Sequence, residues 1–260
     1  MNTISASGEV LKVYQTGDRP ILILCSDGYH YICKYKLPGS SASKLLNEYI
    51  GGCFAKVWRI VTPVTSFVIN DPIIWGGEGA SLSHDPGALL IGSRLMENVV
   101  DISDFNCGHI PLLDNHLEQL LKIALFDIWL ANEDRTCNNY NLLFDLRKKN
   151  IVSIDYGGVF NSGVFTRPLY QLNESDSILS SGLFDQLKGL GIERVLSRLC
   201  VSFNSIVDNC KRSVTNIIET IPATWKIDRG IIENKIIELF NPSWINDSLE
   251  TFVYIINFNQ

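Results

Sequence analysis

The stretch that decides the fold runs Leu130-Ala-Asn-Glu-Asp-Arg-Thr-Cys-Asn-Asn-Tyr-Asn-Leu-Leu-Phe144 and resumes at Ile151-Val-Ser-Ile-Asp-Tyr-Gly157. It predicts the end of a helix, a polar loop and a β-hairpin whose far end carries an aspartate. Pairing of 142–146 with 151–155 sets residue 146 opposite 151 and residue 142 opposite 155. Asn139 then lies at the mouth of the hairpin near Asp155, and the loop that carries Asp134 enters from the same end.

Two carboxylates and an amide at one point suit a magnesium–nucleotide site. Mg²⁺ prefers hard oxygen ligands, and phosphoryl transfer needs metal on the phosphates, a cation on the nucleotide and a residue that faces the acceptor hydroxyl. Asp155 and the amide oxygen of Asn139 fit the metal, and Asp134 fits the acceptor-facing role. The order Asp-x4-Asn, then Asp-x-Gly, matches the spacing found in kinases.

Each of these residues also has an ordinary explanation when it is taken alone. Asp134 and Arg135 could form a surface ion pair, Asn139 could be a turn residue, and Asp155 could cap a turn before Gly157. The spacing, the helix before it and the hairpin between make the combination far more specific than its parts. We therefore interpret the chain as a phosphotransferase.

Composition bounds the class of protein. The chain has 260 residues, 46% of them hydrophobic and 19% charged, so it can bury a large core and fits one two-lobed domain or two small ones. Its net charge of −6 without a basic cluster disfavours nucleic acid or an anionic membrane as the main partner. Seven scattered cysteines without zinc spacing suit a reducing cytoplasm. Neither a signal peptide nor a transmembrane segment is expected, which predicts a cytoplasmic protein.

The patterns change in character along the chain. Apolar runs at 9–14, 21–25 and 31–35 predict three antiparallel strands, 41–58 predicts a helix, and 61–69 and 88–91 predict further strands. From about residue 112 helical periodicity dominates, with examples at 192–203, 206–218, 231–240 and 249–256. This order predicts an α+β fold. We expect a strand-rich lobe at 1–97 and a helical lobe at 98–260.

The motif Asp127-x-Trp129-Leu-x-Asn132-x-Asp134-Arg135, then Asn139-x-Asn141-Leu-Leu, then Ile154-Asp155-x-Gly157 resembles the compact branch of HipA-like kinases. The resemblance covers most of the chain and is strongest over 121–160. It implies a bilobal protein-kinase-like fold, related also to phosphoinositide kinases, that uses ATP and Mg²⁺. By matching positions, Asp134 would be the catalytic aspartate, and Asn139 and Asp155 would bind Mg²⁺.

The resemblance also implies a nucleotide lobe. Lys34, at the end of the third strand, would grip the phosphates and pair with Glu48 in the next helix, with Lys36 as the alternative because strand side chains alternate. The turn with Gly17 and Arg19 would cover the phosphates. The linker at 89–96, with Gly92 and Met96, would meet adenine through its backbone, and Gly92 would either allow close approach of the nucleotide or serve only as a flexible joint. The four histidines and the glycine-rich stretch at 76–79 are expected to have no catalytic role.

Some family features are not expected here. The chain begins almost at the first strand, which predicts that the extra N-terminal subdomain of HipA toxins is absent. Thr16 stands where those toxins carry an autophosphorylated serine. The expected acceptor is a protein serine or threonine, with a small antitoxin-like partner suggested by analogy alone. The alternatives are a small-molecule or lipid kinase and a nucleotide-binding pseudokinase or adaptor.

Overall fold

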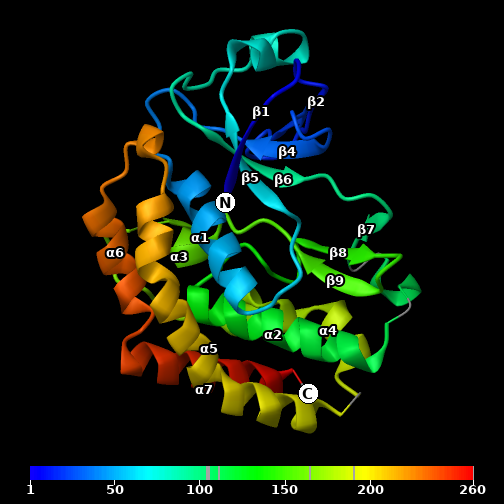
Figure 1. Ribbon diagram of the computed structural model, residues 1–260. Coiled ribbons are helices and arrows are strands. Elements are labelled where there is room, and N and C mark those ends of the chain that lie inside the picture. The colour runs from blue at the N-terminus through cyan, green and yellow to red at the C-terminus, as the bar shows by residue number, and fades with distance from the viewer. Residues whose placement is uncertain (104–105, 111, 164, 190, 260) are drawn as a thin grey trace. The chain divides into compact units, whose positions relative to one another are not determined.

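A computed structural model describes residues 1–103, 106–110, 112–163, 165–189 and 191–259 (Figure 1). The chain divides into two compact units. The first comprises Met1–Tyr49, Pro63–Glu97 and Thr220–Ile227, and the second comprises Ile50–Thr62, Asn98–Glu219 and Asp228–Gln260. Residues 50–62 precede the boundary expected at 97/98 but belong to the second unit. Residues 220–227 follow that boundary but belong to the first unit.

A six-stranded sheet forms the centre of the first unit, in the order β1-β5-β6-β4-β3-β2. Its strands are β1 (Asn2–Ser5), β2 (Lys12–Val13), β3 (Ile21–Leu24), β4 (His30–Lys34), β5 (Thr65–Ile69) and β6 (Leu90–Arg94). The expected antiparallel order of β2, β3 and β4 is confirmed. Strand β1, which pairs in parallel with β5, was not predicted from the sequence. It has few apolar residues and is mostly exposed, so it lacks the pattern that marks a strand.

Two groups of apolar side chains hold the first unit together. One face of the sheet buries residues that alternate along β3 and β4, among them Ile21, Ile23, Tyr31 and Cys33. Trp225, in the 3-10 helix η6 (Ala223–Trp225), packs against Tyr49 and Phe67 with ring centroids 6.3 and 5.6 Å away. Trp225 also donates its indole N–H to the carbonyl of Leu89 at 2.7 Å. The segment 220–227 is thereby fixed to strands that lie far away in the sequence.

The segment between β5 and β6 contains two 3-10 helices, η1 (Pro72–Trp75) and η2 (Glu78–Ser81). The glycine-rich stretch 76–79 falls here. The ring of His84 stacks on Trp75 with centroids 3.7 Å apart, and the Trp75 indole donates to Asn70 at 2.6 Å. His84 therefore packs in a structural contact in this part of the unit.

The second unit is built around α2 (Asp114–Leu130) and a three-stranded sheet of β7 (Val99–Asp101), β8 (Leu142–Asp145) and β9 (Asn150–Ser153). Its other helices are α3 (Val159–Gly163), α4 (Gly182–Leu187), α5 (Ile192–Thr220), α6 (Arg229–Glu238) and α7 (Pro242–Phe258), and the short 3-10 helices are η3 (Cys107–His109), η4 (Glu174–Asp176) and η5 (Ile178–Ser180). Helix α1 (Ser43–Val57) begins in the first unit and ends in the second. The expected α+β class is confirmed.

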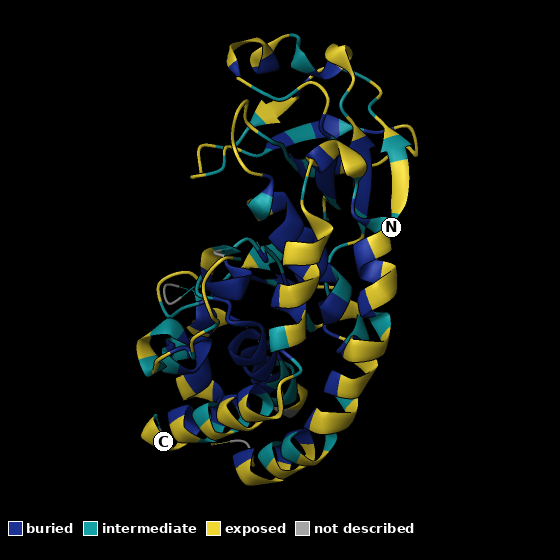
Figure 2. Cartoon of the chain, turned by 90° about the vertical axis from the view of Figure 1, so that its left-hand side faces the viewer, coloured by how far each residue is buried: buried dark blue, intermediate teal, exposed yellow. Residues whose placement is uncertain are grey.

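Helix α5 shows why an expected division was wrong. The sequence analysis placed separate helices at 192–203 and 206–218, but the structure has one helix of 29 residues. Val195, Leu199, Phe203, Val207 and Cys210 recur every three or four residues and are buried, so one apolar stripe continues through the expected gap. Figure 2 shows that buried residues lie along one face of the helices and exposed residues along another.

The hairpin register also differs from the expectation. Leu142 lies opposite Ser153 and Asp145 opposite Asn150, so the pairing is shifted by two residues from the expected 142–155 and 146–151. The cause is Asp145, whose Oδ1 accepts hydrogen bonds from the N–H groups of Arg147 and Lys148 at 2.9 Å each and so starts the turn earlier. A shift of two keeps every side chain on its expected face. It leaves Asp155 two residues beyond the end of β9.

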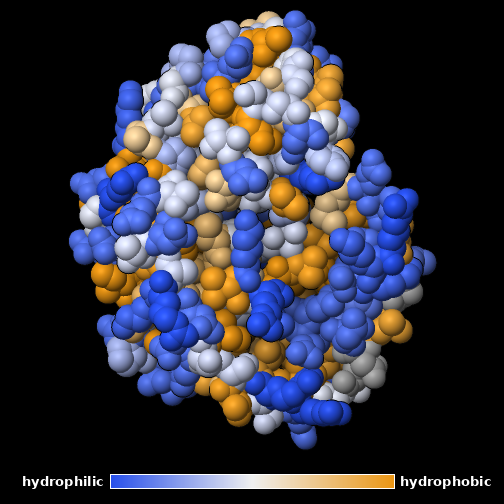
Figure 3. All heavy atoms as spheres, viewed as in Figure 1, coloured by the Kyte–Doolittle hydropathy of each residue, from blue (hydrophilic) through white to orange (hydrophobic). Residues whose placement is uncertain are grey.

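The surface is of mixed character. On the face shown in Figure 3, hydrophilic side chains are interspersed with exposed apolar ones. Among the described residues, no helix combines the length and the apolar composition needed to cross a lipid bilayer. Trp58, Trp129, Trp225 and Trp244 are all buried, as expected for core residues.

Candidate active site

The end of helix α2 directs the chain toward the site. Ala131 adopts a left-handed conformation with φ of 51° and donates its N–H to carbonyls of the last helical turn, which ends the helix. Asn132 follows and donates its backbone N–H to the carbonyl of Asp127 at 2.9 Å. Asp134 then comes two residues later, at the start of a polar loop whose Thr136 and Asn139 exchange backbone hydrogen bonds of 3.0 and 3.2 Å.

Two asparagine amides hold the carboxylate of Asp134. Asn139 donates Nδ2 to Asp134 Oδ1 at 2.8 Å, and Asn141 donates Nδ2 to Asp134 Oδ2 at 3.3 Å. Both amides also donate to the backbone carbonyl of Asp134, at 3.0 and 3.1 Å. The structure therefore brings Asp134 and Asn139 together, and adds Asn141, to which the sequence analysis gave no role.

A buried arginine joins the segments that carry the expected catalytic residues. Arg135 donates Nε to Asp127 Oδ2 at 2.8 Å, so its guanidinium is anchored on helix α2. The same guanidinium donates Nη1 to the carbonyls of Tyr140, at 3.0 Å, and Asn141, and Nη2 to the carbonyl of Ile154 at 3.1 Å. Three segments, from the helix, the loop and the strand before Asp155, thus meet on one side chain.

Arg135 does not form the surface ion pair with Asp134 that their adjacency in the sequence suggests. Arg135 is fully buried, and its acidic partner is Asp127 rather than Asp134. Burial raises the pKa of Asp127, while the charge of Arg135 and a hydrogen bond from Asn132 at 2.7 Å oppose that rise. A buried charge needs such partners, because loss of either one would leave the other without compensation.

Asp155 lies where the strand gives way to a turn. Its φ of 56° is left-handed, and its Oδ1 accepts the N–H of Gly157 at 3.0 Å. The preceding residue, Ile154, donates its N–H to the carbonyl of Asn141 at 3.0 Å. Asp155 is therefore the next residue after one that is hydrogen-bonded to Asn141.

The donor set fits a magnesium ion. Because Asn139 uses Nδ2 to hold Asp134, its Oδ1 is the side-chain atom that can ligate a cation, and Asp155 supplies a carboxylate. Among the described residues there is no cluster of three or more His, Cys, Asp or Glu residues that could cage a metal. Mg²⁺ is commonly held by one or two carboxylates, with phosphates and water completing the shell. The hard oxygens found here suit that mode.

Gly158 packs directly against the loop that carries Asp134. A β-carbon at this position would lie 2.5 Å from Asp134 Cβ, 2.8 Å from its backbone nitrogen and 2.9 Å from Asn132 Oδ1. The carbonyl of Gly158 also accepts the N–H of Glu133 at 3.2 Å. Only glycine permits this approach of two backbones, because the contacts involve main-chain atoms that cannot rotate away.

A left-handed turn follows. Phe160, Asn161 and Ser162, in α3, have φ of 56, 48 and 61°, a conformation that costs a non-glycine residue about 1–2 kcal/mol. Contacts offset that strain. Asn161 exchanges hydrogen bonds of 3.1 and 3.2 Å with the backbone of Tyr170, and Glu133 accepts from Ser162 Oγ at 2.9 Å and from the Tyr170 hydroxyl. The hydrogen bond to Glu133 raises the pKa of Tyr170.

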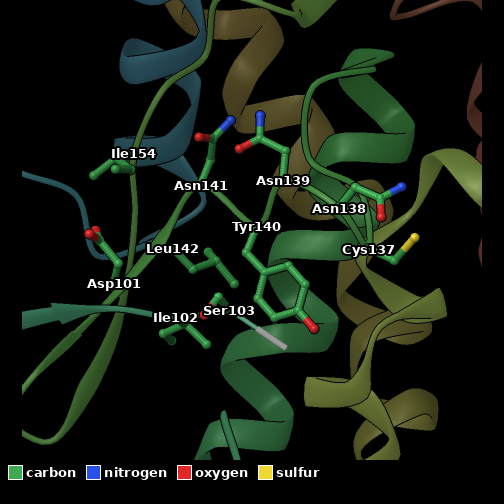
Figure 4. Close-up of a pocket in the computed structure, with 10 residues that line it drawn as sticks. All are labelled: Asp101, Ile102, Ser103, Cys137, Asn138, Asn139, Tyr140, Asn141, Leu142 and Ile154. Atoms are coloured by element: carbon green, nitrogen blue, oxygen red, sulfur yellow. The ribbon is translucent and has the colours of Figure 1, made fainter. Parts of the chain in front are cut away.

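A cavity of about 390 Å³ opens beside the asparagines (Figure 4). Its wall is polar where Asn138, Asn139 and Asn141 line it and apolar where Ile102, Leu142 and Ile154 do. Asp101 and Ser103 contribute a carboxylate and a hydroxyl. In Figure 4, Asn139 and Asn141 lie side by side and extend in the same direction, while the Tyr140 ring extends the other way. The sequence analysis assigned no role to Asp101 or Ser103.

In the first unit, Lys34 and Glu48 form the expected pair. Lys34 Nζ lies 3.0 Å from Glu48 Oε2, and both side chains are largely buried. The alternative residue, Lys36, instead pairs with Asp85 at 2.6 Å, and that hydrogen bond lowers the pKa of Asp85. Each lysine thus has its own carboxylate partner, Glu48 for Lys34 and Asp85 for Lys36.

The other expected nucleotide contacts are placed as follows. Gly17 and Arg19 lie in the turn between β2 and β3, where Arg19 has φ of 44°, and the neighbouring Asp18 forms an ion pair with Lys44 of α1. Gly92 lies inside β6, paired with both neighbouring strands, and a β-carbon there would lie 3.0 Å from Cys33 Sγ. It is therefore a packing glycine in a strand. Met96 follows β6 in irregular, half-exposed backbone.

Histidines have structural roles where contacts define them. His116 is fully buried in α2, where Nδ1 accepts the N–H of Leu113 at 2.7 Å and Nε2 lies 2.8 Å from the carbonyl of Lys149. Both ring nitrogens are therefore used in contacts with the backbone.

Comparison with known proteins adds a family and a fold. The family model described as HipA-like kinase matches residues 8–253. The crystal structure of CtkA, a proinflammatory kinase of Helicobacter pylori, aligns with a TM-score of 0.57 at 12% identity and covers 97% of this chain and 99% of that chain. The FAT and kinase domain of CtTel1 aligns over 92% of this chain and 22% of that chain at 12% identity, with a TM-score of 0.28 that is too low to compare folds. No curated protein matches the chain.

Proposed function

The chain belongs to the HipA-like kinase family, and from that premise we propose that it transfers the γ-phosphoryl group of ATP, with Mg²⁺, to a serine or threonine of a protein. The observation that carries the proposal is the Asp134 carboxylate held between the amides of Asn139 and Asn141. An acid in this setting is oriented but not neutralised, which suits a group that must accept or position a hydroxyl proton.

Each residue has a proposed role. Asp134 orients the acceptor hydroxyl and receives its proton as the oxygen attacks the γ-phosphorus and the bond to ADP breaks. Asn139 and Asp155 hold Mg²⁺, which when bound neutralises charge on the phosphates. In the first unit, Lys34 binds phosphate oxygens, and Glu48 keeps its ammonium group in place at 3.0 Å. The turn of Gly17 and Arg19 contributes backbone N–H groups and a further cation.

The cavity beside the asparagines is the proposed place for the nucleoside. Ile102, Leu142 and Ile154 offer apolar surface for a base, and Asp101 and Ser103 offer hydrogen-bonding groups for a ribose. Asn139 lines the same cavity, so a nucleoside bound there would direct its phosphates toward the proposed metal ligands. The volume of about 390 Å³ lies within the range of small-molecule sites.

The finer parts of the proposal rest on the family. A protein serine or threonine as the acceptor, a small antitoxin-like partner and a cytoplasmic location come from the resemblance to HipA-like kinases and from composition. The absence of a basic cluster in the sequence disfavours a lipid acceptor. A small hydroxyl-bearing acceptor is the alternative that the experiment below must separate.

The test is incubation of the purified protein with radiolabelled ATP and Mg²⁺ in a lysate of its own host. Asp134→Asn and Asp155→Ala are run beside it, and Asp208→Asn, which changes an exposed aspartate on α5, serves as the matched control. We expect a labelled protein band that is lost in the first two variants and kept in the control. Label on a metabolite instead of a protein would favour the small-molecule kinase. ATP binding without transfer to any acceptor would favour a pseudokinase.

A further inference from the structure

A second cavity, of about 250 Å³, lies in the second unit and shares no lining residue with the one in Figure 4. It is enclosed by the segment that follows α1, by one face of α2 and by β9. Its lining consists of Arg59, Ile60, Val61, Asn115, Glu118, Gln119, Lys122, Ile123 and Ile151. None of these residues takes part in the kinase function proposed above.

The residues that line this cavity carry more positive than negative charge. Within the ranges that the structure describes, neither Arg59 nor Lys122 forms an ion pair or a side-chain hydrogen bond. Glu118 is the one acidic residue of the lining, and it is engaged by Arg198 at 2.8 Å from outside the cavity. Two cations therefore face a pocket in a chain whose net charge is −6, and the local excess of positive charge favours an anion.

Most of the other lining residues are apolar or already hydrogen-bonded. Ile60, Ile123 and Ile151 are buried and form an aliphatic floor. Gln119 already uses both ends of its amide, donating to Asn150 Oδ1 at 3.2 Å and accepting from Ile151 N–H at 2.7 Å. Asn115 is exposed at the rim and carries two N–H donors. The pocket is thus lined both by buried isoleucines and by two cations.

The position of Arg59 adds a second observation. It ends α1 in a left-handed conformation with φ of 54°, where Arg59 N–H donates to Lys56 at 3.1 Å and Ile60 N–H donates to Ala55 at 2.9 Å. Glycine suits this cap best, because it has no β-carbon to strain. A cation at a helix C-terminus also interacts favourably with the helix dipole. Replacing Arg59 with glycine would relieve the backbone strain but remove the favourable interaction with the helix dipole, so the two effects on stability oppose each other. Weaker ligand binding without a loss of stability would then indicate that Arg59 has a binding role.

We propose that this pocket binds a small organic phosphomonoester, with the phosphate between Arg59 and Lys122 and the organic part on the isoleucine floor. A phosphomonoester carries close to two negative charges at neutral pH, which matches the two cations. The guanidinium of Arg59 suits a phosphate because its N–H groups can bind two oxygens in parallel. A free volume of about 250 Å³ limits the organic part to a small body such as a single ring.

The test uses phenyl phosphate as the probe and isoleucine δ1-methyl groups labelled with ¹³C as the reporters. We expect saturable shifts of the Ile60, Ile123 and Ile151 methyl signals, assigned by Ile→Val substitution at each position. Arg59→Gly and Lys122→Met should each weaken binding about tenfold or more, because each removes one charge-assisted contact. Arg59→Gly should leave Tm nearly unchanged, since relief of the left-handed strain and loss of the favourable charge at the helix C-terminus oppose each other.

Lys149→Gly is the matched control. Lys149 is also an exposed cation with a left-handed φ, of 53°, and does not line the pocket, so this variant removes the same charge and relieves the same strain elsewhere. It should bind phenyl phosphate as the unaltered protein does. The proposal is overturned if the three methyl signals do not move or if the control weakens binding as much as Arg59→Gly. Equal binding of benzoate would overturn the assignment of a phosphate.

Discussion

Adjacent glycines in helix α1 should respond in opposite directions to the same substitution. A β-carbon on Gly51 would lie 2.5 Å from Tyr156 Cβ and 2.8 Å from Tyr156 Cγ, whereas a β-carbon on Gly52 would meet nothing within 4 Å. Tyr156 has little freedom to move away, because its hydroxyl is hydrogen-bonded to Ser153 Oγ at 2.8 Å and the side chain is buried. Tyr156 also directly follows Asp155.

The magnitudes follow from two terms. Replacement of glycine by alanine inside a helix stabilises it by about 0.8–1 kcal/mol, and both variants gain this term. Gly52→Ala gains nothing else, so its free energy of unfolding should rise by about 1 kcal/mol, which is about 2–4 °C in Tm for a chain near this size. Gly51→Ala must also displace Tyr156, and overpacking of this kind typically costs about 1–3 kcal/mol. Its net effect should be a loss of up to about 2 kcal/mol.

Urea denaturation and kcat measure the two consequences. Displacement of Tyr156 should move Asp155, so Gly51→Ala should lower kcat for phosphotransfer, while Gly52→Ala should leave kcat unchanged. Equal stability changes for the two variants would refute the argument from packing. A destabilised Gly51→Ala with full kcat would show instead that Tyr156 moves without affecting the metal ligand beside it.

Four further changes test other contacts. Arg135→Lys should lower the free energy of unfolding, measured by urea denaturation, by about 2–4 kcal/mol, since lysine cannot reproduce the contacts with Asp127 and three carbonyls. A loss under about 0.5 kcal/mol would show that these contacts do not stabilise the fold. Gly158→Ala should reduce kcat about 10²-fold by pushing Asp134 aside, whereas Gly189→Ala, where a β-carbon meets open space, should not. Lys34→Met should abolish most of kcat/KM for ATP, while Lys36→Met, which only leaves Asp85 unpaired, should retain it. Because the folded pKa of Tyr170 is raised, its contact with Glu133 stabilises the fold fully below about pH 10 and is lost as pH rises through the folded value. The pKa values of Tyr14, Tyr31 and Tyr35 are raised as well, so stability measured from pH 9 to 12 should fall in both proteins, but by less in Tyr170→Phe than in the parent.

The contact between Asp134 and Asn139 could be predicted from the sequence because that information is local. Asp134 and Asn139 are five residues apart on one loop, and their contact needs only the turn between Thr136 and Asn139. The family was likewise predicted correctly from the motif, and the match over residues 8–253 confirms it. The hairpin register was wrong by two residues, because the side chain of Asp145 decides where the turn begins and the apolar pattern fits either register.

The contacts that hold the site rigid could not be predicted in this way. A sequence shows Asp134 and Arg135 as neighbours, and the usual inference is an exposed pair. The structure buries Arg135 completely and gives it Asp127, eight residues earlier, with carbonyls from two other segments. Those partners are chosen by the packing of α2 against the hairpin, which is a property of the folded unit. The same holds for the left-handed turn at 160–162, where no glycine marks the conformation and contacts from Glu133 and Tyr170 offset its strain.

Rigidity of this kind has a functional consequence. A loop that only carried Asp134 and Asn139 would need to be ordered each time an acceptor bound, and that ordering would oppose the reaction. Here one buried guanidinium fixes the helix, the asparagine loop and the backbone before Asp155 together. The energetic cost of burying a charge is met during folding, so the proposed catalytic groups are already oriented before any substrate binds. On this reasoning Arg135 is a positioning residue, and its loss should lower kcat more than it raises KM for ATP.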